Sequence, residues 1–403
     1  MIFHPRLKKV VLDARLNSGV NPGIQTLIEG FIQGLNELPI KGYELYWITT
    51  EDNSWLVKNL KNKRRVITDH ARHIEEIPID KERLFPKRVH HQNTFLNQID
   101  HRLLRDPMSL DSIKPDLVHF FSQDAFVTKY RSIYHPHDLQ HLHFPGNFSS
   151  AQLEWRGSAW PIFAKLASSI VVGSDHVADD LEDFWKIPKE KISKIDLRTQ
   201  STDISTQAHE KKGNNFHQVI EGDYIIYPAA YYTHKNHLNL LRAVELLRRE
   251  GFHFKVVLTG GVTTSENEIT RLVLDLNLQN QVIQLGYIER RHLIDLIKLS
   301  KMVVVPSMYE SRSFPVEEGI ASHVPVIASD IPGIKEQFHN PEFLFNPTDP
   351  IDIAVKIKKV LKMSDSERML VTDKNLTSAS KRNWSDVATD YLKLWKNVMC
   401  LKS

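Results

Sequence analysis

The hydrophobic and polar positions of this chain follow two patterns, short apolar runs and longer segments with apolar residues three and four positions apart. Residues 9–13 form an apolar run that predicts a strand, and residues 24–35 follow with the spacing of an amphipathic helix. Residues 43–49 predict a second strand. A strand, a turn, a helix and a strand in this order are typical of a doubly wound α/β domain.

The remainder of the first half is less regular. Apolar runs at 117–121 and 169–173 predict two further buried strands. Residues 55–105 are rich in Lys, Arg and His, and we expect helices and long loops there. Residues 199–215 are almost entirely polar and predict a linker.

A second α/β pattern begins after that linker. Residues 224–227 predict a strand, and residues 236–250 predict a helix with two arginines in its last turn, as the helix dipole favours. Further strands are predicted at 255–259, 282–285, 302–305 and 324–328. The fold class is therefore expected to be α/β, with two doubly wound Rossmann-like domains facing across a cleft at the carboxyl ends of their strands.

Length and composition fit this expectation. A chain of 403 residues suggests two domains, which we place at 1–205 and 216–385, with a last helix at about 386–403 packing back on the first domain. The net charge of +3 gives no sign of a nucleic-acid-binding field. The single cysteine, Cys400, excludes an internal disulfide and fits a reducing compartment. We see no signal peptide and no membrane-spanning apolar run, so we expect a cytoplasmic protein, peripheral to the inner membrane face if it touches a membrane.

The strongest candidate site follows the strand predicted at 302–305. Glu310 falls in the loop at the carboxyl end of that strand, and Glu318 falls one turn into the next helix. Carboxylates placed in this way can accept hydrogen bonds from vicinal hydroxyls, and free backbone N–H groups between them can receive sugar hydroxyls or phosphate oxygens. The alternative is structural, with Glu310 capping a turn and Glu318 a solvated first-turn glutamate.

Two other loops have the chemistry to bind phosphate. Lys235 lies at a predicted helix start, where a cation opposes the helix dipole, and a bound diphosphate would remove this conflict. The turn from Gly19 to Gly23 precedes the first helix and resembles a phosphate-cradling loop, although it matches neither GxGxxG nor GxxxxGK[ST]. The alternatives are a solvated lysine and an ordinary turn between a strand and a helix.

Four histidines lie close together in the sequence, namely His135, His137, His141 and His143. Their spacing matches no standard zinc pattern and no cysteine lies nearby, so we assign no metal site to them. A histidine that lines the cleft is the favoured interpretation, and loop packing is the alternative.

Taken together, these residues resemble the family-4 retaining glycosyltransferases of the GT-B architecture. The Glu-x7-Glu arrangement of Glu310 and Glu318 is that family's hallmark. The segment His234-Lys235-Asn236-His237 looks like a variant of the family's Lys-Gly step, and Val282 to Gly286 followed by Tyr287 looks like its nucleotide-base strand and loop. The resemblance is strongest in the second half of the chain.

The resemblance implies a role for each residue. Glu318 would bind the ribose hydroxyls, Glu310 the donor sugar ring and Lys235 the diphosphate. From the first, acceptor-side domain His137 would contact the sugar, and the turn from Gly19 to Gly23 would close on the phosphates. The donor would also be contacted by His234, Tyr287, Arg312, Ser313 and Phe314.

The chain departs from the family at two places. The family usually has glycines around an aromatic residue after the first glutamate, where this chain has Ser311, Arg312 and Ser313. The family often has an arginine six residues before the phosphate-binding lysine, where this chain has Ala229. One cation leaves the charge of a diphosphate uncompensated, so His234 or Arg312 would have to substitute.

The expected function is a metal-independent, retaining transfer of a hexose from a nucleotide diphosphate sugar to a saccharide or lipid-linked acceptor, in polysaccharide biosynthesis. Many transferases hold Mg²⁺ with an Asp-x-Asp motif, which this chain lacks, so we expect no metal and no other cofactor. A mannose-type donor is suggested by the variant segment around Lys235. No nucleic-acid partner is expected.

Three other functions remain open. The chain is alternatively a GT-B enzyme of another class, such as a nucleotide-sugar epimerase or a phosphorylase, or a non-catalytic sugar-nucleotide-binding scaffold. The third alternative is a peripheral membrane or polyanion binder acting through the basic amphipathic stretch from Trp55 to Arg65, which is otherwise a solvated basic helix.

Overall fold

The computed structural model divides the chain into two compact units, Met1–Leu197 with Arg382–Ser403, and Arg198–Lys381. The linker predicted at 199–215 lies outside the described residues, as does most of the basic stretch at 55–105. The residues that the structure describes are 6–16, 22–50, 54–57, 64–68, 74–76, 102–104, 109–197, 220, 222–261, 263, 265–378 and 382–401.

The first unit is built on a seven-stranded parallel sheet with the strand order β3-β2-β1-β6-β7-β8-β9. Its strands are β1 (Lys8–Asp13), β2 (Tyr43–Thr49), β3 (Arg64–Thr68), β6 (Leu117–Phe120), β7 (Ser132–Tyr134), β8 (Ser169–Val172) and β9 (Ile192–Lys194). The chain fills the sheet outward in one direction from β1 and then in the other from β6, as in doubly wound folds.

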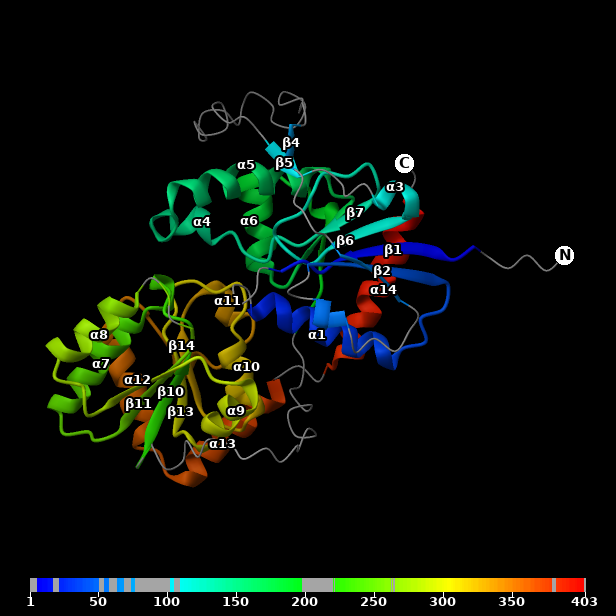
Figure 1. Ribbon diagram of the computed structural model, residues 1–403. Coiled ribbons are helices and arrows are strands. Elements are labelled where there is room, and N and C mark those ends of the chain that lie inside the picture. The colour runs from blue at the N-terminus through cyan, green and yellow to red at the C-terminus, as the bar shows by residue number, and fades with distance from the viewer. Residues whose placement is uncertain are drawn as a thin grey trace. The chain divides into compact units, whose positions relative to one another are not determined.

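Helices cover both faces of this sheet (Figure 1). Residues of α1 (Pro22–Glu37) and α14 (Trp384–Cys400) form one buried cluster with the strands, and residues of α5 (Ser150–Leu166) and α6 (Asp175–Trp185) form another. Two shorter helices, α3 (Ser109–Ile113) and α4 (Gln140–His143), lie in the connections. The helix nearest the C-terminus thus completes the first unit.

The two clusters explain why the strands are continuous apolar runs. Val10 and Leu12 of β1 join the cluster with α1 and α14, whereas Val11 joins the cluster with α5 and α6. In β6, Leu117 and Val118 divide in the same way. Since successive side chains of a strand point to opposite faces, a sheet that is buried on both faces needs apolar residues at every position.

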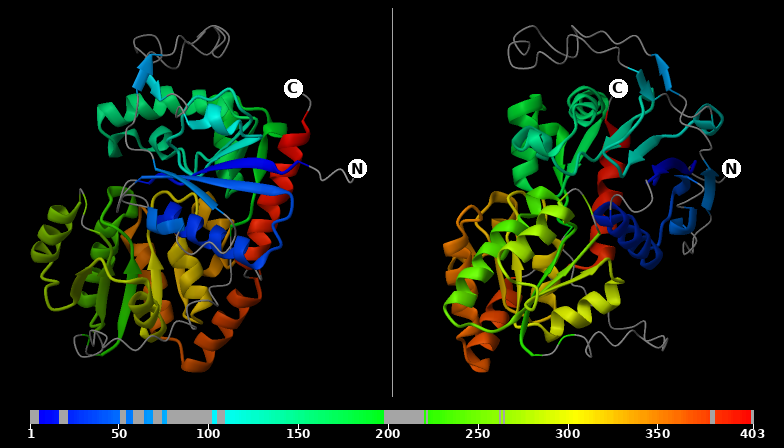
Figure 2. Two further views of the ribbon diagram at one scale, coloured as in Figure 1. Left: turned by 45° about the vertical axis from the view of Figure 1, so that its right-hand side comes forward. Right: turned by 60° about the vertical axis from the view of Figure 1, so that its left-hand side comes forward.

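Two glycines allow α1 and α14 to pack closely, and the helices lie side by side in both views of Figure 2. A Cβ atom at Gly30 would lie 2.0 Å from the Trp384 ring, and one at Gly34 would lie 2.0 Å from the backbone oxygen of Trp384. A side chain can move aside, but a backbone carbonyl can move only with its helix. Gly34 is therefore the less replaceable of the two.

Replacing Gly34 with alanine is expected to destabilise the protein by about 1–3 kcal/mol, because the new methyl group forces α1 and α14 apart. The matched control is Gly157→Ala in α5, where a Cβ atom meets nothing within 4 Å. There the change should stabilise by about 0.5–1 kcal/mol through helix propensity. Chemical denaturation checks both variants, and equal unfolding midpoints for the two would contradict the packing argument.

The second unit has a six-stranded parallel sheet with the order β12-β11-β10-β13-β14-β15. Its strands are β10 (Tyr224–Pro228), β11 (Lys255–Thr259), β12 (Val282–Gly286), β13 (Met302–Val305), β14 (Val326–Ser329) and β15 (Leu344–Phe345). Its helices are α7 (His237–Arg249), α8 (Glu266–Asp275), α9 (Arg290–Leu299), α10 (Phe314–Ala321), α11 (Pro332–Lys335), α12 (Pro350–Leu361) and α13 (Asp365–Ser378). Figure 1 shows α7, α8 and α12 on one face of the sheet and α9, α10 and α13 on the other. The predicted α/β class with two doubly wound units is confirmed.

Helices and long loops are expected in 55–105, and of this range the structure describes a short 3-10 helix and three strands, of which β3 was not expected. These residues form a 3-10 turn, Ser54–Val57, the strand β3, and a small antiparallel pair of β4 (Ile74–Glu76) and β5 (Arg102–Leu104). β3 contains the β-branched residues Val66 and Ile67, which favour strands, and it pairs in parallel with β2. A single basic helix from Trp55 to Arg65 is excluded because Arg64 and Arg65 belong to β3.

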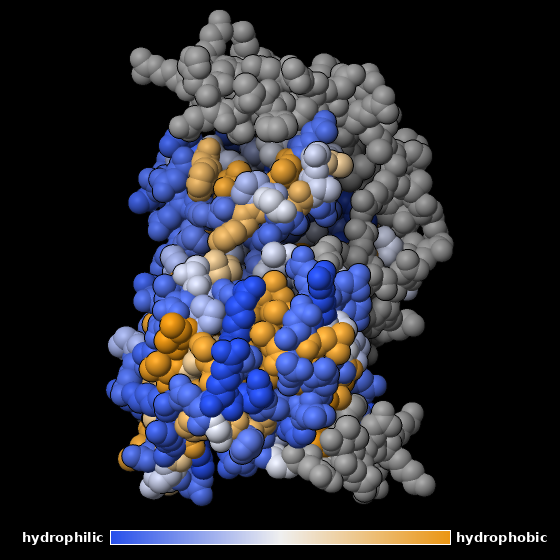
Figure 3. Space-filling view, turned by 90° about the vertical axis from the view of Figure 1, so that its left-hand side faces the viewer, coloured by the Kyte–Doolittle hydropathy of each residue, from blue (hydrophilic) through white to orange (hydrophobic). Residues whose placement is uncertain are grey.

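The surface shows small hydrophobic patches between hydrophilic side chains on the face seen in Figure 3. Exposed large apolar side chains occur on several helices, among them Leu274 of α8, Ile351 of α12 and Leu370 of α13. Of the helices that the structure describes, none is both long and apolar enough to cross a bilayer.

Candidate functional site

The candidate site of the second unit lies where β10 and β13 end. These strands are parallel neighbours, so the loops that follow them leave the sheet at the same edge. The two loops are joined by hydrogen bonds. The Met308 N–H donates to the His234 carbonyl oxygen over 2.7 Å, and Asn236 Nδ2 donates to the Pro306 carbonyl oxygen over 2.8 Å.

The loop after β10 ends in a tight turn that positions Lys235. Thr233–Lys235 forms a 3-10 turn, Asn236 takes the left-handed conformation with φ 60°, and α7 begins at His237. The side chain of Asn236 also donates to the Pro347 carbonyl oxygen over 2.7 Å, so the turn is fixed on two sides. Lys235 therefore lies just before the helix rather than in its first turn.

Lys235 and Glu310 form an ion pair. Lys235 Nζ lies 2.7 Å from Glu310 Oε1, and the side chains are 21% and 8% exposed. Ser307 Oγ donates to the same oxygen over 2.7 Å, and the hydroxyl of Tyr227 contacts both Ser307 Oγ, at 3.0 Å, and the Lys235 carbonyl oxygen, at 2.9 Å. Burial raises the pKa of Tyr227 well above its ordinary value, so this hydroxyl stays neutral. Glu310 does stabilise its own turn through Ser307, but it also binds a cation, and Lys235 is not a solvated lysine.

Glu318 occupies the predicted position in α10, but it is not a solvated first-turn glutamate. The residue is 7% exposed, and Glu318 Oε1 lies 3.3 Å from Arg290 Nη2. Burial raises the pKa of Glu318 from 4.5 to about 7, with Arg290 acting against this rise and Glu317 adding to it. At neutral pH the carboxyl group is therefore close to half protonated and ready to accept hydrogen bonds from a ligand.

Sequence reasoning missed Arg290, although a usable signal was present. Arg290 is the first residue of α9, where a cation opposes the helix dipole, the same conflict that drew attention to Lys235. In the structure this cation faces Glu318. A cation in the first turn of a helix is thus a useful sign of a buried acidic partner or an anionic ligand in this fold.

The residues that replace the expected glycines pack among themselves. Arg312 Nη2 lies 2.7 Å from Glu317 Oε2, and the guanidinium carbon lies 5.4 Å from the centre of the Phe314 ring. The Ser313 N–H donates to Gln337 Oε1 over 3.0 Å. Arg312 Nε and Nη1 are buried, and no hydrogen-bond partner for them occurs in the described part of the chain. These two guanidinium nitrogens are therefore buried without a partner among the described residues.

His234 does not supply the missing cation. Burial lowers the pKa of His234 to about 2, with Lys235 acting in the same direction, so the imidazole is neutral at physiological pH. The ring stacks on Tyr232 at 5.7 Å between centroids. Ala229, at the position where the family often has an arginine, is buried. Between the two substitutes considered, only Arg312 carries a charge.

The backbone at Gly333 lies very close to the loop that carries Glu310. A Cβ atom at Gly333, in the short helix α11, would lie 1.8 Å from the Glu310 backbone oxygen. Only glycine fits at this position. The Pro332-Gly333 step gave no signal of this role in the sequence, because the contact joins loops from different strands.

Tyr287 lies apart from these contacts and is mostly solvent-exposed. It follows β12 directly after Gly286, which takes φ 65°, and its side chain is 79% exposed. An exposed aromatic ring at the edge of the sheet where the strands end offers a face on which a base can stack.

In the first unit, His137 is held in one orientation. It takes φ 57°, its side chain is half-buried, and its Nε2 lies 2.7 Å from the Phe121 carbonyl oxygen. Burial lowers the pKa of His137, so the ring is neutral, and Nε2 must carry the proton that the carbonyl accepts. Nδ1 is then an acceptor.

Gly23 lies in the first turn of α1, and Gly19 lies outside the described residues.

The other clustered histidines have different surroundings. His119 and His135 share a hydrogen bond of 2.9 Å between their Nε2 atoms, and Trp395 Nε1 donates to His119 Nδ1 over 3.1 Å. Burial lowers the pKa of His119 to about 3, and that of His135 falls for the same reason. His141 packs against the Trp160 ring at 5.3 Å. His135 and His141 are therefore buried in the core, as is His119.

Comparison with known proteins finds glycosyltransferase relatives. Residues 211–375 match the family model of the glycosyl transferases group 1, which identifies a domain of that kind in the second unit. The chain is 24% identical over 230 residues to the O-antigen chain mannosyltransferase RfbU of Salmonella typhimurium, covering 57% of this chain and 61% of that protein. It is 26% identical over 174 residues to the O-antigen chain mannosyltransferase B of Escherichia coli, covering 43% and 45%. The chain thus spans about half the length of these curated relatives.

Solved structures match along nearly the whole chain. A glycosyltransferase from Rickettsia africae superposes with a TM-score of 0.64 at 17% identity, covering 98% of this chain and 100% of that one. Anabaena HepE in complex with UDP and glucose superposes with a TM-score of 0.65 at 16% identity, covering 97% and 100%. These matches show that the fold is that of the GT-B glycosyltransferases.

Proposed function

We propose that this chain is a retaining glycosyltransferase of family 4 that moves a hexose from a nucleotide diphosphate sugar without a metal ion. The observation that carries the proposal is the ion pair of Lys235 with Glu310 at the carboxyl edge of the second sheet, together with the buried Glu318 of the helix that follows β13. Ligands of open α/β sheets bind at this edge. The match of the same unit to the glycosyl transferases group 1 supports it.

The donor would be held at three points. Glu318 accepts hydrogen bonds from the ribose hydroxyls, and the exposed ring of Tyr287 stacks on the base. Lys235 and the two unpaired donors of Arg312 bind the diphosphate, which offsets the absence of a cation at Ala229. Glu310 orients the sugar ring through its second carboxylate oxygen, because Oε1 already holds Lys235 and Ser307.

Retention is proposed from the resemblance to family 4, in which the acceptor attacks the sugar from the face that the diphosphate leaves and the leaving phosphate takes the acceptor's proton. The contacts of Glu310 argue only against a glycosyl-enzyme intermediate. A carboxylate that accepts from both Lys235 and Ser307 is a weak nucleophile, because its charge is already shared. His137 would contact the sugar from the first unit through its neutral ring.

Protein groups would take the place of a metal ion at the leaving diphosphate. Lys235 and Arg312 carry two positive charges, which are paired with Glu310 and Glu317 and would turn to the diphosphate when the donor binds. No side chain caps the first N–H groups of α10 in the described structure. Groups of this kind stabilise developing phosphate charge where they are fixed in advance of the reaction. Transfer is therefore expected to proceed in EDTA.

The names of the relatives point to the donor and acceptor. Two of them are O-antigen chain mannosyltransferases, so we infer a mannose donor and a saccharide or lipid-linked acceptor in polysaccharide biosynthesis. Such an acceptor would bring the protein to the cytoplasmic face of a membrane. Contact through Trp55 to Arg65 remains a hypothesis, since most of that stretch lies outside the described residues.

A donor screen tests the proposal. The protein is incubated in EDTA with GDP-mannose, UDP-glucose and other nucleotide sugars, with membrane lipid extract as acceptor source, and nucleoside diphosphate release and sugar incorporation are measured. We expect one donor to be consumed in step with incorporation, with the anomeric configuration kept. A changed nucleotide sugar without acceptor would indicate an epimerase, and binding without turnover of any donor would indicate a scaffold. Transfer that stops in EDTA and returns with Mg²⁺ would contradict metal independence.

A further inference from the structure

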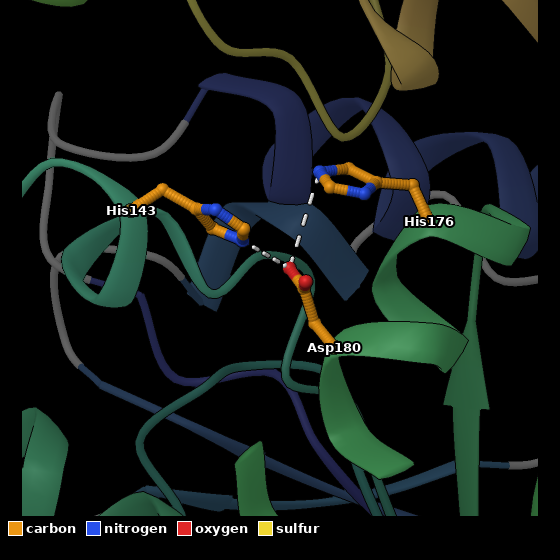
Figure 4. Close-up of side chains that lie close together, drawn as sticks. All are labelled: His143, His176 and Asp180. Atoms are coloured by element: carbon orange, nitrogen blue, oxygen red, sulfur yellow. Dashed lines mark hydrogen bonds and ion pairs between the residues drawn. The ribbon is translucent and has the colours of Figure 1, made fainter. Parts of the chain in front are cut away.

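A second cluster of functional groups lies in the first unit, formed by His143, His176 and Asp180 (Figure 4). The two imidazole rings converge on the carboxylate of Asp180. His143 Nε2 lies 2.8 Å and His176 Nε2 lies 3.9 Å from Asp180 Oδ2. The function proposed above uses none of these residues.

The local structure explains why the three side chains meet. His176 and Asp180 lie four residues apart on α6 and therefore share a face of that helix. His143 is the last residue of α4, which lies in the connection between β7 and α5. The sequence showed His143 only as one of a histidine run. Its partners lie on a helix much later in the chain, and 37 positions separate His143 from Asp180.

We propose that His143, His176 and Asp180 form a binding site for a divalent transition-metal ion, best suited to Zn²⁺. One ligand atom from each residue lies within 4.8 Å of the others. Zn–N and Zn–O distances near 2.0–2.1 Å place the ligands of a tetrahedral site about 3.3 Å apart, so small side-chain movements bring these atoms to that spacing. In the described part of the chain, no other three such side chains come together in this way.

The choice of metal follows from the donor set. Two imidazole nitrogens and one carboxylate oxygen suit Zn²⁺, whereas Mg²⁺ and Ca²⁺ prefer oxygen ligands alone. Asp180 is 7% exposed at its side chain, where a carboxylate charge is costly without a cation. His143 is 29% exposed, which leaves the site a route for the ion and room for water as the fourth ligand.

The consequence of metal binding would be structural. The ion would tie the end of α4 to α6, and α4 follows directly on the segment that carries His137. The proposed metal holds this segment in place and takes no part in the charge compensation assigned to Lys235 and Arg312. This inference stands whether or not the proposed transfer reaction is correct.

Isothermal titration of the full, EDTA-treated and dialysed chain with Zn²⁺ tests the site. We expect one ion per chain, with the affinity reduced at least about 10-fold in His176→Gln and in Asp180→Asn. The matched control is His253→Gln, since His253 is an exposed histidine of the other unit, and it should bind as the wild type does. Absence of binding by the wild type, or equal binding by wild type, His176→Gln and Asp180→Asn, overturns the proposal.

A second measurement covers the case in which the variants do not fold, which circular dichroism will show. Co²⁺ is then titrated into the wild-type chain, and visible absorption of a four-coordinate ion with nitrogen and oxygen ligands is expected at one equivalent and lost on adding Zn²⁺. A spectrum that stays that of aqueous, six-coordinate Co²⁺ counts against the site. Neither measurement depends on transferase activity.

Discussion

Replacing Lys235 with alanine is expected to lower kcat for sugar transfer about 100- to 1,000-fold, the usual cost of one lost donor to a developing negative charge. Lys235 Nζ is held 2.7 Å from Glu310 at the edge of the sheet where the donor is proposed to bind. The variant loses the cation that would stabilise the leaving diphosphate. The affinity for the free nucleoside diphosphate should also fall about 10-fold or more, since charge-assisted hydrogen bonds contribute about 1.5–3 kcal/mol.

The control for this variant is Lys301→Ala, which removes a paired lysine away from the proposed donor site. Lys301 also forms an ion pair, 3.2 Å from Asp223, but its side chain is 32% exposed and it lies before β13 rather than after it. Lys301→Ala should leave kcat unchanged. Because Lys235→Ala also leaves the buried Glu310 carboxylate without its cation, the double variant with Glu310→Gln removes that charge, and comparing the unfolding midpoints of the two variants shows how much stability the unpaired carboxylate costs. If folded Lys235→Ala keeps wild-type kcat and nucleotide affinity, the assigned role of Lys235 is wrong.

Replacing Glu318 with glutamine should stabilise the unliganded protein at pH 8 and weaken its binding of nucleotide. Burial raises the pKa of Glu318 from 4.5 to about 7, so the folded protein favours the protonated carboxyl group more than the unfolded chain does. As the pH rises from 4.5 to about 7, the unfolded chain gains ionisation first, and the free energy of unfolding falls. At about 1.36 kcal/mol for each pKa unit, the loss is about 3 kcal/mol above pH 7.

The two consequences of Glu318→Gln are measured separately. Chemical unfolding should show a higher free energy of unfolding for Glu318→Gln than for the wild type, with a small difference at pH 5 and a larger one at pH 8. Nucleotide titration at pH 8 should show an affinity about 10-fold lower, because a neutral amide oxygen replaces a charged acceptor of the ribose hydroxyls. Glu289→Gln is the matched control, since Glu289 pairs with Arg291 at 2.9 Å but is 65% exposed. A stability difference between Glu318→Gln and the wild type that does not change with pH would refute the assigned pKa.

Much of the second unit could be predicted from local patterns. The strands at 255–259 and 302–305 have the predicted bounds, because both are apolar runs between turn residues. The helix predicted at 236–250 begins one residue later, at His237, since Asn236 adopts the left-handed conformation. The first half was harder, and β3 was missed because a short apolar centre lies among arginines.

The pairing of site residues could not be predicted in the same way. Lys235 and Glu310 are separated by 75 positions and meet only because β10 lies beside β13 in the sheet. Arg290 and Glu318 belong to α9 and α10. Gly333 belongs to α11, which follows β14, and lies against the backbone oxygen of Glu310. None of these contacts leaves a periodic signal, because each joins elements that are distant in the chain.

The sequence by itself determined most strands and helices of the second unit, and which acidic, basic and aromatic residues follow their strand ends, whereas β3 of the first unit was missed. The spacing of apolar residues shows which face of a single helix or strand is buried, and this information is local to that element. Only the tertiary structure decided which of these residues become partners, how deeply each is buried, and hence its charge. Glu318 shows the reason most clearly, because the rise in its pKa comes from desolvation by surrounding elements that no single segment of sequence describes.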